Sequence, residues 1–130
     1  MHVDLATLRS YLEYNVVELK YTRRRPRAGT PPTRRMLCTN SKGFLMSLLA
    51  GSVFHYTPPT KAPKYNAVSN NLIIAYDLFK QDFRAVSAES VDVITLLPVK
   101  NDEDTEKFWE YFRANIEPMS AADKIRFMNT

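Results

Sequence analysis

The sequence predicts an α+β fold in which helices flank a small antiparallel sheet. Residues 1–14 and 102–130 place apolar side chains at helical spacing, whereas residues 15–97 contain alternating and continuous apolar runs that are typical of strands. A chain of 130 residues with 45% hydrophobic residues can bury one core. We therefore expect a single domain over residues 1–130.

The first expected elements are a helix and a hairpin. Asp4 is a suitable N-cap for a helix that carries three leucines at helical spacing. The segments 15–22 and 34–39 alternate as half-buried strands do, and the sequence between them contains three prolines and a glycine, which cannot continue a strand ladder. The sequence thus predicts a hairpin with a long loop.

The middle of the chain predicts a short helix and then a second hairpin. Residues 41–50 are apolar enough for a helix, and residues 53–71 are too rich in proline for a central strand. Residues 70–79 form a nearly continuous apolar run, followed by a tight turn and by one or two strands over residues 83–97. We expect this second hairpin to be the spine of the sheet.

Two helices are expected at the C-terminal end. Residues 102–117 begin with acidic residues, which complement the helix dipole, and Tyr111 lies off the apolar face. Ser120 can cap a last helix with Ile125 and Met128 directed inward. The expected core-facing stripe of the longer helix consists of Phe108, Trp109, Phe112 and Ile116.

Residues 72–94, LIIAYDLFKQDFRAVSAESVDVI, resemble the last two strands of the WYL-type Sm/SH3-like barrel, which contain a leucine-valine-alanine-tyrosine-aspartate run, a charged turn and an aromatic-arginine pair. The segments VVELKYTRRR and TRRMLCT are similar to the first hairpin of these barrels. The resemblance covers roughly residues 15–97. It implies a small SH3-like (Sm-like) antiparallel β-barrel with peripheral helices, of the kind that phages encode as single-domain proteins.

The same resemblance implies one ligand-binding residue. In WYL domains, basic residues of the final strand help to bind a nucleic acid or nucleotide, and Arg84 matches one of them. Two further arginines of that pattern are replaced here by Ser87 and Ser90, and its tryptophan-tyrosine pair is replaced by Asn70 and Asn71.

Catalytic and metal-binding patterns are not found in the sequence. His2 and His55 have no cysteine, histidine or carboxylate at ligand spacing, and the three glycines are too far apart to form a phosphate loop. Cys38 lies on an expected strand, as a small buried hydrophobe would. We therefore expect a protein that is not an enzyme and has no cofactor and no metal.

Charge is distributed unevenly along the chain. Residues 20–35 carry seven cations and no acid, although the whole chain has a net charge of only +4. Arginines on a loop can neutralise phosphates, and tyrosines near lysines can stack unpaired bases. The nucleic-acid-binding residues predicted on this basis are Arg23, Arg24, Arg25, Arg27, Arg34 and Arg35, extended by Tyr56, Lys61, Lys64, Tyr65 and Arg84.

Other interpretations of these charges stay open. The arginine segment can also meet an acidic protein or be the solvated tip of a hairpin, and it can pair with the acidic C-terminal helix within one molecule or between copies. The alternative function is a module that binds and modulates a host protein through that helix. Its predicted partner-binding residues are Glu103, Asp104, Trp109 and Tyr111.

The expected location is the cytoplasm, which would be that of the host cell for a phage-encoded protein. The single cysteine cannot form an intramolecular disulfide, and no signal-peptide pattern stands at the N-terminus. The longest apolar runs are far shorter than the roughly 20 residues of a membrane span. The expected process is viral transcription or replication.

Overall fold

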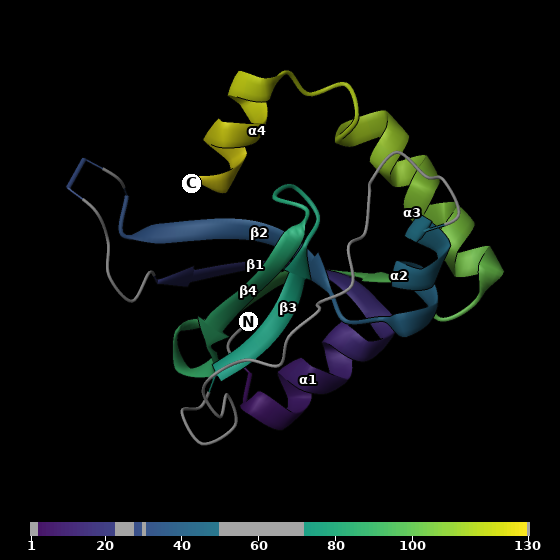
Figure 1. Ribbon diagram of the computed structural model, residues 1–130, viewed down its shortest axis with the longest axis horizontal. Coiled ribbons are helices and arrows are strands. Elements are labelled where there is room, and N and C mark those ends of the chain that lie inside the picture. The colour runs from purple at the N-terminus through teal and green to yellow at the C-terminus, as the bar shows by residue number, and fades with distance from the viewer. Residues whose placement is uncertain (1–2, 23–27, 30, 50–71, 130) are drawn as a thin grey trace.

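The computed structural model describes residues 3–22, 28–29, 31–49 and 72–129, and it is an α+β structure with helices on both sides of one sheet (Figure 1). The expected helices and strands are all found within these ranges. Their bounds are α1 Leu5–Tyr14, β1 Asn15–Thr22, β2 Thr33–Thr39, α2 Lys42–Leu49, β3 Leu72–Asp77, β4 Asp82–Ser87, the 3-10 turn η1 Ala88–Ser90, β5 Asp92–Pro98, α3 Asp102–Asn115 and α4 Ala121–Met128.

The described strands form one antiparallel sheet in the order β4-β3-β2-β1-β5. Strand β2 is therefore central, and β4 is at an edge, so the expectation that the second hairpin is the spine was wrong. The cause is β5, which returns to pair with β1 from Asn15↔Pro98 to Lys20↔Asp92.

The sheet is open across the described residues. Strands β4 and β5 are its two edges, and β3 meets β2 at only two register pairs, Cys38↔Asp77 and Thr39↔Tyr76. Each of the other strand pairs has six register pairs. Because a barrel needs its edge strands to pair with each other, the closed barrel expected from the sequence is not formed here.

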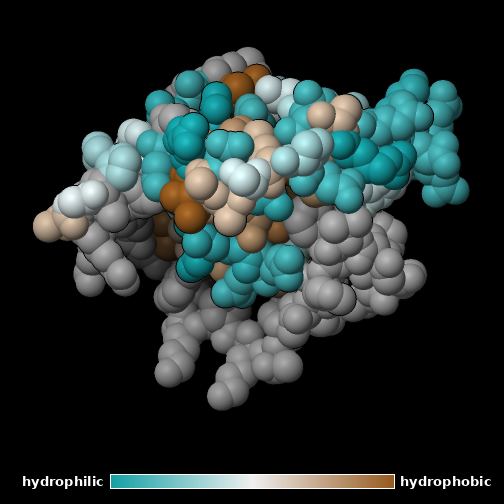
Figure 2. Space-filling view, turned by 90° about the horizontal axis from the view of Figure 1, so that it is seen from above, coloured by the Kyte–Doolittle hydropathy of each residue, from teal (hydrophilic) through white to brown (hydrophobic). Residues whose placement is uncertain are grey.

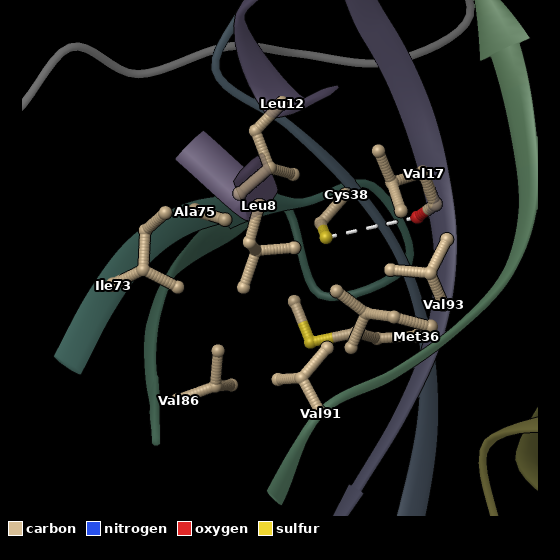
Figure 3. Packing of buried hydrophobic residues seen from close by; sticks show 11 residues of the cluster. Leu8, Leu12, Val17, Met36, Cys38, Ile73, Ala75, Val86, Val91 and Val93 are labelled. Carbon is tan, nitrogen blue, oxygen red and sulfur yellow. Dashed lines mark hydrogen bonds between the residues drawn. The ribbon is translucent and has the colours of Figure 1, made fainter. Parts of the chain in front are cut away.

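One face of the sheet packs against α1. The side chain of Asp4 caps this helix by accepting a hydrogen bond from the Thr7 amide at 2.7 Å, as expected. Leu8 and Leu12 are fully buried, and Figure 3 shows them directed toward apolar side chains of β1, β2, β3 and β5. The members of this cluster are Leu8, Leu12, Val17, Leu19, Met36, Cys38, Ile73, Ala75, Val86, Val91 and Val93.

The second face packs against α2 and α3, because successive strand residues point to opposite sides. Val16 and Leu37 therefore belong to the same buried cluster as the aromatic side chains of these helices, whereas their neighbours Val17 and Cys38 belong to the cluster on the α1 face. The predicted stripe of α3 is confirmed: Phe108, Phe112 and Ile116 are buried and Trp109 is partly buried. Tyr111 is also partly buried against this core.

Helix α4 covers the sheet on the side opposite α1 (Figure 1). Ser120 caps it as expected, by accepting a hydrogen bond from the Asp123 amide at 3.1 Å. Met128 is buried, but Ile125 is 55% exposed, so its expected inward direction was wrong. The reason is that the side-chain contacts of α4 with the rest of the fold come from its last turn, where Phe127 and Met128 lie. Figure 2 shows apolar side chains among hydrophilic ones on this side of the molecule.

Candidate nucleic-acid interface

The arginine-rich segment joins two strands that pair at six register positions up to the ends that adjoin it. The register runs from Val17↔Cys38 to Thr22↔Thr33, and the hairpin extends away from α1, α2 and α3 (Figure 1). Gly29 has a φ of +84°, a left-handed conformation that glycine adopts without strain. The hairpin thus fixes both ends of the segment on neighbouring strands.

Four of the predicted phosphate contacts lie outside the described residues. These are Arg23, Arg24, Arg25 and Arg27, all within five residues of the end of β1 at Thr22. The same holds for the predicted stacking residues and lysines Tyr56, Lys61, Lys64 and Tyr65.

The end of the hairpin that adjoins this segment carries a like-charged cross-strand pair. Lys20 of β1 lies opposite Arg35 of β2, and both side chains are partly exposed. Like charges directly opposite each other destabilise a sheet. Asp92 of β5 lies opposite Lys20 on its other side and offsets part of this charge. Lys20 was not among the predicted nucleic-acid-binding residues. Its position in the sequence could have indicated it, because Lys20 follows the buried Leu19 on an alternating strand and lies close to the arginines.

Arg35 also reaches α4. Its guanidinium carbon is 4.8 Å from the centroid of the Phe127 ring, within the range of a cation–π contact. Its Nε is buried and has no hydrogen-bond partner among the residues that the structure describes, and the same is true of Nε in Arg84. An unpaired buried donor costs about 1 to 3 kcal/mol.

Arg34 has a different role from the one predicted. It is 8% exposed, and its Nη2 lies 2.7 Å from Oδ2 of Asp77 in an ion pair across 43 sequence positions. The same nitrogen lies 3.8 Å from Sδ of Met128. Because its guanidinium is buried in these contacts, we assign Arg34 to the structure of the sheet and leave it out of the proposed phosphate contacts.

Asp77 balances two opposing effects. Burial raises the pKa of its carboxyl, whereas the charge of Arg34, the amides of Lys80 and Phe79, and the charge of Arg84 act to lower that pKa. The two amides donate to Oδ1, at 2.9 Å from Phe79 and 3.2 Å from Lys80. Arg34 is thus ion-paired with this buried carboxyl, Arg84 acts on it through its charge, and Arg35 faces α4. Nothing in the local sequence of Asp77 indicates this pairing.

The residues predicted for the alternative, protein-binding site lie on α3, and two of them pack against the core. Trp109 stacks on Phe44 with ring centroids 5.5 Å apart and an interplanar angle of 24°. Glu103 is exposed and pairs with Lys107 at 3.6 Å, and Asp104 is partly buried in the first turn of α3. Since Trp109 and Tyr111 both pack on the core, no observation favours this site as a second function.

Cys38 is the buried hydrophobe that its strand position predicted. It is 0% exposed, its Sγ lies 3.7 Å from the Val17 carbonyl oxygen, and burial followed by the charge of Asp77 raises the pKa of the thiol well above its usual value (Figure 3). Thiolates are the reactive form of cysteine. In the part of the chain that the structure describes, no three His, Cys, Asp or Glu residues are placed to hold a metal ion.

We expect Cys38 to be inert toward a thiol reagent such as DTNB until the protein unfolds. The reagent should label one thiol per chain in denaturant and less than a tenth of that in native buffer over an hour, because burial blocks access and keeps the thiol protonated. Parallel urea curves by labelling and by circular dichroism measure this. Rapid labelling of the native protein would show that the α1 face of the sheet opens easily.

Comparison with known proteins found no relative of this chain. No protein-family model, no curated protein and no solved structure matches this chain. No helix among the described residues is long and apolar enough to cross a membrane.

Proposed function

We propose that this chain is a non-enzymatic nucleic-acid-binding protein that holds phosphates electrostatically with little sequence specificity. The observation that carries the proposal is the β1–β2 hairpin, which fixes an arginine segment between neighbouring strands and places Lys20 beside Arg35 at its base. A like-charged pair at this position costs stability, and Asp92 offsets only part of its charge, so a bound phosphate would stabilise it further. The proposed contacts are Arg23, Arg24, Arg25, Arg27, Lys20 and Arg35, and this surface is extended by Tyr56, Lys61, Lys64, Tyr65 and Arg84.

We also propose, as the finer description of the fold, an open variant of the SH3-like barrel. Four consecutive strands form a meander, and the fifth returns to β1. This connectivity supports the proposal, because bringing β4 and β5 together would close such a sheet. A phage origin and a role in viral transcription or replication are proposed on the sequence resemblance alone.

The test is a binding titration with fluorescent single-stranded and duplex DNA at two salt concentrations. Each duplex phosphate contact contributes about −0.9 to the slope of log affinity against log salt. Four contacts then predict that a fourfold rise in salt weakens binding by roughly two orders of magnitude. Substituting Arg23, Arg24 and Arg25 with alanine should weaken low-salt binding strongly and reduce the slope by about 3.

The matched control removes three cations elsewhere. Lys107, Arg113 and Lys124 lie on α3 and α4, and changing them to alanine gives the same change in net charge. This variant should keep most of the affinity and the original slope. The proposal is wrong if neither DNA binds at low salt, or if the two triple variants bind equally well.

A further inference from the structure

A pocket of about 400 Å³ lies far from the hairpin tip, where the end of α1 meets the start of α2 and the connection from β5 to α3. Figure 1 shows these segments side by side at the end of the sheet where β1 begins. Strand β1 spans Asn15–Thr22, so at about 3.3 Å per residue roughly 25 Å separates this pocket from the arginine segment. The pocket and the hairpin are therefore separate surfaces. Residues that line the pocket include Arg9, Glu13, Tyr14, Asn40, Lys42 and Lys100.

Three cations from three separate segments line this pocket. Arg9 comes from α1, Lys42 begins α2, and Lys100 follows β5. Glu13 is the one carboxylate among the lining residues, so the lining has a formal charge of +2. Among the residues that the structure describes, none of these three cations forms an ion pair. A concave surface lined by one sign of charge concentrates counter-ions, so the ligand that fits this pocket is an anion.

The pocket also offers an aromatic ring. Tyr14 is 45% exposed and lines the pocket, and the ammonium of Lys100 lies 5.3 Å from the centroid of its ring. A volume near 400 Å³ falls within the range of about 300 to 1,000 Å³ that is typical of sites for organic ligands. An inorganic phosphate would leave most of this space empty. The ligand therefore has an organic part besides its charge.

We propose that this pocket binds a phosphate monoester whose organic part carries a flat ring, which is the chemistry of a nucleoside monophosphate. Arg9, Lys42 and Lys100 hold the phosphate, and the ring of Tyr14 packs against the flat group. Stacking of a base on an aromatic side chain is tolerant of base identity, so the pocket selects for phosphate and ring more than for one base. A free nucleotide and the phosphorylated end of a nucleic-acid strand share this chemistry.

The first test is calorimetric titration with AMP, with adenosine and inorganic phosphate as comparisons. We expect AMP to bind more tightly than either, because it uses both the cations and the ring. Changing Lys42 and Lys100 together to alanine should weaken AMP binding at least about tenfold, since hydrogen bonds to charged groups are lost. Changing Tyr14 to leucine should weaken AMP binding but leave phosphate binding unchanged.

The control variant changes Lys107 and Lys124 to alanine, which removes the same charge from α3 and α4. It should bind AMP as the parent protein does. The proposal is overturned if AMP does not bind at millimolar concentration, or if the two double variants bind it equally. Thermal unfolding of each variant confirms that it is folded, and both substituted lysines of the pocket are exposed.

A second test distinguishes the two sources of the ligand in the protein with Arg23, Arg24 and Arg25 changed to alanine. Oligonucleotides with a 5′-phosphate and with a 5′-hydroxyl end are compared with AMP. Tighter binding of the phosphorylated end than of AMP indicates a strand end, and the reverse indicates a free nucleotide. Three of the proposed hairpin contacts are removed, and those that remain meet both oligonucleotides equally, so the difference between the two strand ends does not depend on the proposed function. Equal binding of both oligonucleotides together with no AMP binding refutes the pocket alone.

Discussion

Replacing Asp77 with alanine is expected to lower the free energy of unfolding by about 3 to 5 kcal/mol. The carboxyl of Asp77 is fully buried and lies 2.7 Å from the guanidinium of Arg34, which is itself 8% exposed. Without Asp77, the Arg34 charge stays buried with no counter-charge, and the amides of Phe79 and Lys80 lose their acceptor. Urea unfolding followed by circular dichroism measures the change.

Two further variants separate charge from hydrogen bonding at this position. Asp77→Asn keeps a carbonyl oxygen for the amides of the turn but removes the negative charge, so it should be less damaging than alanine. The double variant Arg34→Met, Asp77→Leu removes both charges and should recover most of the lost stability, because apolar replacements of buried ion pairs are often neutral or stabilising.

An exposed ion pair provides the control. Glu103 and Lys107 are 3.6 Å apart on α3, with side chains 81% and 70% exposed respectively. Water screens such a pair, so Glu103→Ala should change the free energy of unfolding by no more than about 0.5 kcal/mol. If Asp77→Ala were as mild as Glu103→Ala, the assignment of the Arg34–Asp77 pair as a structural contact of the sheet would be wrong.

Local signals predicted the elements but not their arrangement. The caps Asp4 and Ser120 and the aromatic stripe of α3 are set within one or two helical turns, and the structure has them as expected. The place of β5 beside β1 depends on pairing across most of the chain, for which no local pattern exists. The strands were therefore predicted correctly from the sequence, but the prediction of which strands lie at the centre of the sheet was wrong.

The same distinction explains the candidate sites. Arg34 was grouped with its arginine neighbours because they are adjacent in sequence, yet its partner Asp77 is 43 positions away. Arg9, Lys42 and Lys100 are isolated basic residues in sequence, and only the fold brings them around one pocket. Ile125 was expected inward from its spacing with Met128, but α4 contacts the sheet mainly through its last turn. Long-range packing decided each of these cases.

Phe44→Ala is expected to destabilise the fold by about 3 to 5 kcal/mol. Phe44 is 2% exposed, and its ring meets Phe108 edge-on at 5.2 Å and stacks on Trp109 at 5.5 Å. It thereby joins α2 to α3 over the second face of the sheet. Alanine would leave a cavity and remove both aromatic contacts. Because Trp109 is the only tryptophan in the chain, its fluorescence reports the change directly, both in urea curves and as a red shift of the native emission.

Met46 gives the matched control on the same helix. Its side chain is 61% exposed, so Met46→Ala should stay within about 0.5 kcal/mol of the parent protein and leave the emission of Trp109 unchanged. Phe44→Leu keeps most of the buried volume and should fall between the two alanine variants. Equal stability of Phe44→Ala and Met46→Ala would mean that α2 does not hold α3 in place. A stability that rises from alanine through leucine to phenylalanine at position 44 would instead show that the aromatic cluster attaches α3 to the sheet. The same cluster would then also hold the β5–α3 connection that carries Lys100.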